Sequence, residues 1–167
     1  CGNYLAVCSI DGSMLVYTIN GFKTLNAINI KTEGIYCLRY SPDSKLIAVG
    51  GDDLKVMIFD SKTLKYLFSF TGHTGCIQDI VWTNENDELK VISVSMDATM
   101  RVWNMNTRES EYIFSDHLSD INSIAISSNG SFVFTCADDS SVNVYDFFNR
   151  DHFLILKPHF GPIYSVD

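Results

Sequence analysis

A repeat of about 42 residues runs through the chain. An aspartate stands six residues before an aromatic residue at four places: Asp11/Tyr17, Asp53/Phe59, Asp97/Trp103 and Asp139/Tyr145. The steps between successive aspartates are 42, 44 and 42 residues. A fixed period of this length indicates a repeat architecture in which each unit is one four-stranded sheet, the blade of a propeller.

The histidines follow the same repeat. His73, His117 and His159 each stand four residues before an isoleucine. That isoleucine opens an alternating apolar run, which is typical of a strand with one buried face. Ile35 opens the same kind of run, but Lys31 stands where the histidine would be. The second unit is therefore expected to lack one polar element of the repeat.

With Gly-His near the start of a unit and Trp-Asn or a related pair at its end, the pattern resembles the WD40 repeat. The resemblance covers the whole chain and implies an all-β fold, a WD40 β-propeller with about four consecutive blades. The blades are expected at residues 1–32 (incomplete), 33–74, 75–118 and 119–160, with the start of another at 161–167. Because such rings usually close with about seven blades, we expect an open arc of a larger ring and a chain cut from a longer protein. The alternative is a four-bladed ring in which a strand at 163–166 completes the first blade.

The resemblance also implies a hydrogen-bonded chain of four side chains within each complete blade. It would join a His before the first strand, a Ser or Thr of the second strand, the turn Asp and the aromatic residue of the third strand. Carried over, these tetrads are His73, Ser93, Asp97 and Trp103 in the third blade, and His117, Thr135, Asp139 and Tyr145 in the fourth. The chemistry is consistent, since a buried indole N–H needs an acceptor, which a hydroxyl supplies while donating onward.

An enzyme is the alternative interpretation of these residues, because His73, Ser93 and Asp97 have the composition of a hydrolase triad. The recurrence of equivalents at the same offsets in the fourth unit favours a structural role. His152 lies outside the pattern and is expected in an exposed turn. The sequence contains no GxSxG, P-loop, GxGxxG or HExxH motif and no paired-cysteine metal spacing. We therefore expect no catalytic residue, no metal and no cofactor.

Composition limits the compartment and the ligand class. The chain is 46% apolar, has no apolar run near 18 residues and carries five cysteines without a CxxC pair. These features favour a protein without a membrane span in a reducing, intracellular compartment, cytoplasmic or nuclear. The net charge of −8 and the scattered Lys and Arg residues argue against direct binding of nucleic acid. A small-molecule substrate is not expected either.

The turns that carry the repeat aspartates should project around the mouth of the propeller channel. Family resemblance implies that partners bind at this rim. The candidate rim residues are Glu33, Tyr36, Asp52, Gln78, Met96, Asp120, Asn122, Asp138 and Tyr164. Its acidic members would suit a basic segment of another protein, by charge complementarity that mainly steers encounter. Each of them could equally be an ordinary polar turn residue.

The leading hypothesis is a non-catalytic scaffold that holds other proteins in a multi-subunit complex. A peptide-recognition propeller of signalling or ubiquitin-ligase type, or an enzyme-associated propeller, is the alternative. Segments such as FTGHTG at 70–75 resemble nucleolar propeller proteins that process small-subunit ribosomal RNA. The same segments are shared loosely with coatomer, signalling and ubiquitin-ligase propellers, so the pathway stays open.

Overall fold

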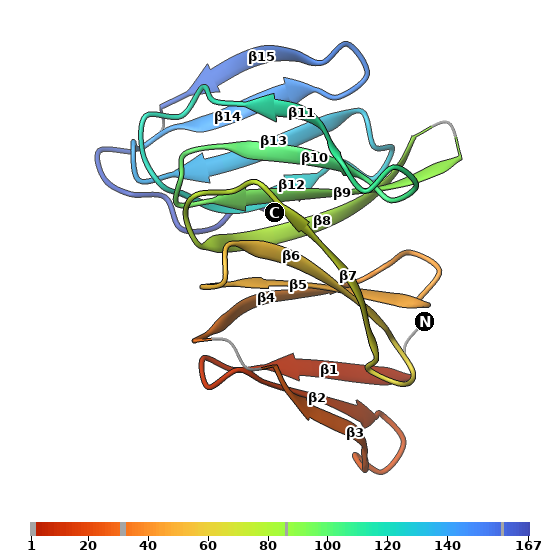
Figure 1. The fold of residues 1–167 in the computed structure, drawn as a ribbon. Helices are drawn as coiled ribbons and strands as arrows, with labels where there is room; N and C mark the ends of the chain where they lie inside the picture. The colour runs from red at the N-terminus through yellow and green to blue at the C-terminus, as the bar shows by residue number, and fades with distance from the viewer. Residues whose placement is uncertain (1–2, 31–32, 86, 158) are drawn as a thin grey trace.

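Four antiparallel sheets stacked in chain order make up the fold (Figure 1). The computed structural model describes residues 3–30, 33–85, 87–157 and 159–167. The first sheet holds β1 (Tyr4–Cys8), β2 (Ser13–Thr18) and β3 (Thr24–Asn29), and the second holds β4 (Ile35–Tyr40), β5 (Leu46–Gly51), β6 (Lys55–Asp60) and β7 (Tyr66–Thr71). The third holds β8 (Ile77–Glu85), β9 (Glu88–Ser95), β10 (Met100–Asn104) and β11 (Ser110–Phe114), and the fourth holds β12 (Ile121–Ile126), β13 (Phe132–Ala137), β14 (Val142–Asp146) and β15 (Asp151–Leu156).

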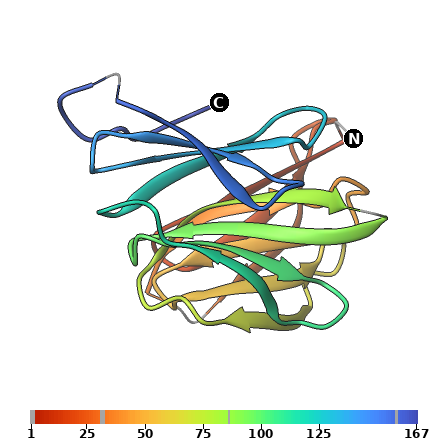
Figure 2. The same ribbon diagram turned by 90° about the horizontal axis from the view of Figure 1, so that it is seen from above.

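Each sheet is an up-and-down meander, with neighbouring strands joined by short turns. The expectation of an all-β fold built from consecutive blades is confirmed. The arc is not closed: the red and blue ends of the chain share no sheet (Figure 2). Lys31 lies outside the described residues, so its place in the repeat is not seen. No helix among the described residues is long and apolar enough to cross a membrane.

The predicted strand at residues 163–166 is wrong. The Ile163 N–H donates to the Ala137 carbonyl at 3.1 Å, which places this segment against the fourth blade, but no described strand lies beside it to form a ladder. The repeat gives the bond a counterpart, since the Ile35 N–H donates to the Ser9 carbonyl of the first blade at 3.3 Å. Because the segment stays with the fourth blade, the four-bladed ring does not form in this structure.

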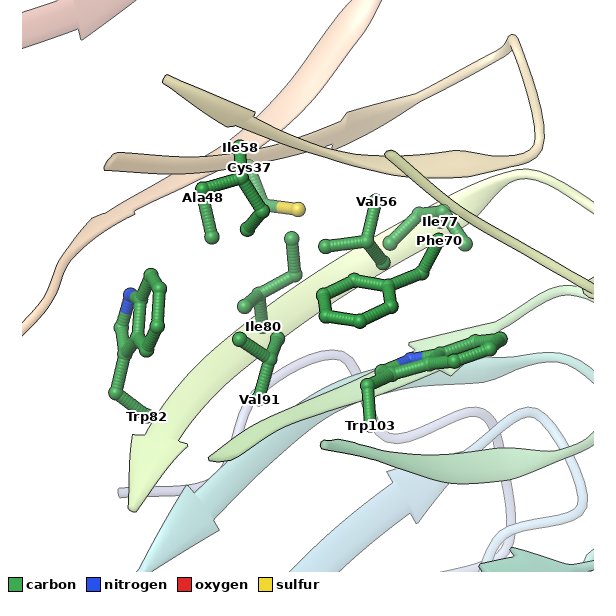
Figure 3. Packing of buried hydrophobic residues seen from close by; sticks show 10 residues of the cluster. All are labelled: Cys37, Ala48, Val56, Ile58, Phe70, Ile77, Ile80, Trp82, Val91 and Trp103. Carbon is green, nitrogen blue, oxygen red and sulfur yellow. The ribbon is translucent and has the colours of Figure 1, made fainter. Parts of the chain in front are cut away.

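The hydrophobic core lies between the blades. Side chains of the second and third blades form one cluster, in which Phe70 stacks on Trp103 with ring centroids 5.2 Å apart (Figure 3). A second cluster joins the third and fourth blades, and a third cluster joins the first and second. Val49 and Phe59, which stand at the tetrad positions of the second blade, are fully buried in that third cluster. Packing therefore takes the place of polar bonds there.

A buried carboxylate ties three inner strands together. Asp79 on β8 accepts a hydrogen bond from Arg39 of β4 at 2.9 Å and another from the Ser123 hydroxyl of β12 at 3.1 Å. Trp82 adds a bond from its indole N–H to the Arg39 carbonyl. Because buried charges are costly unless they are paired, these contacts favour one arrangement of the blades.

The backbone at Gly51 lies close to the backbone at Gly34, which leaves no room for a side chain. A β-carbon on Gly51 would lie 2.0 Å from the carbonyl oxygen of Gly34. Gly51→Ala should therefore lower the free energy of unfolding by about 1–3 kcal/mol, the usual cost of overpacking. Urea unfolding followed by circular dichroism measures this, with Gly161→Ala as the control, because nothing lies within 4 Å of a β-carbon there. Equal stability of the two variants would contradict the prediction.

Candidate functional site

The tetrad of the third blade is a continuous chain of hydrogen bonds. The Trp103 indole N–H donates to the Ser93 hydroxyl at 2.8 Å, and that hydroxyl lies 2.8 Å from His73 Nε2. His73 Nδ1 lies 2.8 Å from an Asp97 carboxylate oxygen. Since an indole only donates, the Ser93 proton points to Nε2, and the imidazole proton is therefore on Nδ1, facing Asp97. Thr99, which was not among the predicted tetrad residues, donates to Asp97 at 2.6 Å.

The tetrad of the fourth blade repeats most of this geometry. His117 lies 2.9 Å from Asp139 through Nδ1 and 2.7 Å from the Thr135 hydroxyl through Nε2. Tyr145 is buried at the aromatic position, and its hydroxyl accepts a bond from Asn143 at 3.3 Å. Burial raises the pKa of Tyr145 to about 12. Tyr145 is thus bonded within its own strand through Asn143.

A hydroxyl also follows the turn aspartate by two residues in both blades. Thr99 and Ser141 each bond the carboxylate and lie 3.2 Å from the histidine Nδ1. The repeat could have revealed them, since they occupy the same offset in two units.

These groups are poorly placed for catalysis. The Ser93 and Thr135 side chains are fully buried, so no substrate reaches the hydroxyls. Two surface hollows of about 340 and 350 Å³ lie elsewhere, one beside Trp82 and the other beside Tyr112, and neither is lined by a tetrad residue. His152 is not in an exposed turn as the sequence suggested. Strand β15 begins at Asp151, so His152 lies within this strand and is half-buried. Its Nδ1 lies 3.6 Å from an Asp116 carboxylate oxygen.

The turn carboxylates are strongly acidic. Burial alone would raise the pKa of Asp139, but hydrogen bonds from Ser141, the Leu118 N–H and His117 outweigh it and lower the pKa to about 2. Burial would likewise raise the pKa of Asp97. The bonds from His73 and Thr99 outweigh burial, so the pKa of Asp97 also falls well below its usual range.

Acid should therefore unfold the protein through these carboxylates. A lowered folded-state pKa gives stability that is present above the unfolded value of 3.8 and is lost as pH falls towards 2. Asp139→Asn should lower the free energy of unfolding by about 1–2 kcal/mol at pH 7 and flatten its fall below about pH 5. Urea unfolding at several pH values measures both effects. The exposed Glu109→Gln is the control, and a wild-type pH profile in Asp139→Asn would contradict the prediction.

Among the described residues, the turn aspartates of the first two blades have no histidine partner. Asp11 accepts a bond from the Ser13 N–H at 2.8 Å, and Asp53 accepts one from the Lys55 N–H at 3.2 Å. Tyr17 is half-buried. These aspartates therefore shape their own turns and do not join loops together.

The candidate rim residues lie at one end of the blades, with Tyr36, Gln78 and Asn122 at the starts of β4, β8 and β12 and the others on the loops. The Tyr36 hydroxyl donates to Asp52 at 2.6 Å, which raises the pKa of Tyr36 to about 12. Asn122 bonds Asp138 at 2.7 Å and the Ile163 carbonyl at 2.9 Å. The others contribute less to this bonding: Glu33 is exposed, Gln78 and Asp120 are half-buried, and Met96 and Tyr164 are 44% and 74% exposed.

Two apolar residues of this end of the blades were missed. Ile10 and Leu118 are 69% and 89% exposed. The repeat marks Ile10 as the counterpart of Asp52, Met96 and Asp138, each one residue before a turn aspartate. Alignment of the four units could have found it. The polar residues of the sequence alone do not reveal Ile10.

Thiols and metal ligands add no further site. Cys8, Cys37, Cys76 and Cys136 are free thiols. Burial raises the pKa of Cys37 and brings that of Cys136 to about 11, so both remain protonated and act as apolar core. Within the part of the chain that the structure describes, no group of three or more His, Cys, Asp or Glu residues is placed to hold a metal ion.

Comparison with known families agrees with the blade geometry. The family model "WD domain, G-beta repeat" matches residues 108–146, and "Anaphase-promoting complex subunit 4 WD40 domain" matches residues 3–85. The chain belongs to the WD40-repeat family. Its blades are thus WD40 blades, with the buried tetrads inside the third and fourth.

Three known proteins are similar to most of the chain. The chain is 35% identical over 107 residues to Periodic tryptophan protein 2 of Arabidopsis thaliana, covering 61% of this chain and 11% of that protein. It is 25% identical over 159 residues to Pre-mRNA-splicing factor cwf17 of Schizosaccharomyces pombe, covering 95% and 46%. It is 27% identical over 106 residues to the UBP9-binding protein bun62 of the same yeast, covering 62% and 20%. The chain thus spans less than half the length of each.

Proposed function

We propose that this WD40 chain is part of a non-catalytic scaffold that holds other proteins in a multi-subunit complex. The observation that carries the proposal is that the polar groups a hydrolase would need are buried, while those of the rim reach the surface. Ser93 and Thr135, the hydroxyls a hydrolase would need, are buried and bonded. The side chains of the rim are exposed or half-buried, and Tyr36 and Asn122 hold Asp52 and Asp138 in place by hydrogen bonds. Such a surface suits a protein partner.

The partner is a basic segment of another protein. None of the nine candidate rim positions carries Lys or Arg, and four of them are Asp or Glu. Charge complementarity of this kind speeds encounter and excludes wrong partners more than it adds affinity. The same acidity, with a net charge of −8, disfavours direct contact with nucleic acid.

The pathway we propose is RNA processing inside the cell, in the nucleus or nucleolus. Ribosome biogenesis is supported by the likeness to Periodic tryptophan protein 2, and splicing by the likeness to cwf17. A cytoplasmic or signalling role as a peptide-recognition propeller is the second candidate. The name of bun62, a UBP9-binding protein, favours it.

Affinity capture of the protein from its own cell extract at moderate salt tests the proposal. Mass spectrometry should find a stoichiometric set of subunits, with ribosome-assembly or splicing factors among them. Loss of those subunits after nuclease treatment would point to binding through RNA and count against a protein scaffold. Recovery of the protein alone, together with turnover of a small-molecule substrate, would overturn the proposal.

A further inference from the structure

The rim alternates in character from blade to blade. The residue before each turn aspartate is Ile10 in the first blade, Asp52 in the second, Met96 in the third and Asp138 in the fourth. The two apolar members are 69% and 44% exposed. Apolar and acidic side chains thus take turns at one structural position.

Contacts between the loops connect these positions into one surface. A β-carbon on Gly34 would lie 3.3 Å from Ile10 and 2.7 Å from the Asp52 carboxylate, so both side chains flank the same glycine. Asp52 in turn faces Cys76 and, after burial, is the main cause of the raised pKa of this thiol. The first, second and third blades therefore meet along this path.

The path continues to the fourth blade. The Cys76 carbonyl accepts the Met96 N–H at 3.0 Å, and the Asp120 carboxylate acts on the Cys76 thiol through space. The Asp120 carbonyl accepts the Asp138 N–H at 3.0 Å. Ile10, Asp52, Met96 and Asp138 thus follow one another along a continuous edge, with Asp120 adding charge beside Asp138.

We propose that this edge binds a partner segment that presents basic and apolar side chains in turn along one face. This inference rests on the proposed scaffold function and names the chemistry of its partner. Lys or Arg side chains meet Asp52 and Asp138, with their aliphatic stems lying along the apolar neighbours. Apolar side chains of the segment pack on Ile10 and on Met96, whose flexible thioether adapts to different shapes. A uniformly basic segment would leave both apolar positions uncovered.

Two peptides of identical composition test this proposal. One carries pairs of lysines and pairs of leucines in turn over about eight residues, so that an extended chain presents the two kinds alternately along each face. The other carries the same residues as a lysine block followed by a leucine block. Fluorescence anisotropy with the full chain should give at least about fivefold tighter binding of the alternating peptide, since two apolar contacts are gained at little cost. Equal affinity for the two peptides would overturn the proposal.

Variants locate the binding surface. Asp52→Asn and Asp138→Asn should each weaken binding of the alternating peptide by about two- to fivefold, the usual range for one exposed charge pair, and more so at low salt. Met96→Ala should weaken it by a similar factor. The controls are Glu109→Gln and Phe148→Ala, which make the same kinds of change in turns at the opposite end of the blades. If the controls weaken binding as much as the rim variants, the rim is not the site.

Failure of this inference differs from failure of the scaffold function. If affinity capture returns subunits and Asp52→Asn/Asp138→Asn recovers them undiminished, the rim inference falls and the scaffold stands. If capture returns no subunits, the proposed function itself falls.

Discussion

Trp103→Ala is expected to lower the free energy of unfolding by about 3–5 kcal/mol, the range for removing a large buried aromatic side chain. The indole is 1% exposed and stacks on Phe70 between the second and third blades (Figure 3). Its loss would leave a cavity in that interface and would remove the donor that Ser93 accepts. Urea unfolding followed by circular dichroism measures the loss without depending on Trp103 fluorescence.

Trp103→Phe separates the two contributions. A phenyl ring keeps much of the packing on Phe70 but lacks the N–H, so this variant should lose only about 1–2 kcal/mol, near the worth of one buried hydrogen bond and some packing. If Trp103→Ala costs less than about 1 kcal/mol, the Trp103 side chain does not hold the second and third blades together. If both variants cost the same, packing contributes little and the hydrogen bond dominates.

The repeat explains why so much of the fold could be predicted. Each unit cannot bury its apolar faces alone, so a regular spacing of Asp97, Trp103 and their counterparts implies stacked sheets. The meeting of His73 with Ser93 follows from the same spacing, because position in the unit decides position in space. Local patterns are reliable wherever the unit repeats.

What the sequence could not predict is mostly contact between blades that breaks the repeat. Asp79 binds Arg39 and Ser123, but its own counterparts in the neighbouring blades are Cys37 and Ser123, which are not acidic. Nothing local marks the aspartate as a partner of residues about 40 positions away on either side. The failed strand at residues 163–166 has the same cause, since a strand needs a neighbour and a pattern of apolar residues does not supply one.

The rim could be predicted in part. Tyr36 and Asp52 could be placed on one loop-bearing face from the repeat, but their bond depends on rotamers. Ile10 was overlooked because a search for chemistry looks for polar groups, while a protein-binding surface also needs apolar ones. The tetrads, by contrast, drew attention as a possible catalytic triad although the fold buries them.

A cluster of charges between the third and fourth blades, also invisible in the sequence, carries the last prediction. Lys90 Nζ lies 2.5 Å from Glu85 and 2.6 Å from Glu111, and its side chain is only 7% exposed. Arg150 of the fourth blade pairs with Glu85 as well, and Asn104 donates to Glu111 at 2.6 Å. The Lys90 ammonium therefore bonds two carboxylates, that of Glu85, which it shares with Arg150, and that of the more exposed Glu111.

Lys90→Met should lower the free energy of unfolding by about 3–5 kcal/mol at pH 7, because removing one member of a buried ion pair leaves charge uncompensated. The double variant Lys90→Met/Glu111→Gln should recover a large part of that loss, since neutral groups of similar size replace the charges. Burial raises the pKa of Glu111, but the bonds from Lys90 and Asn104 outweigh burial and lower this pKa. The stability that Glu111 contributes is therefore present above the unfolded pKa of 4.5 and is lost as the pH falls. The gap between wild type and Lys90→Met in urea unfolding should thus narrow below about pH 4.5 as the orphaned carboxylates take up protons. A gap that is independent of pH, or a double variant no more stable than Lys90→Met, would show that the methylene packing of Lys90 matters and its charge does not.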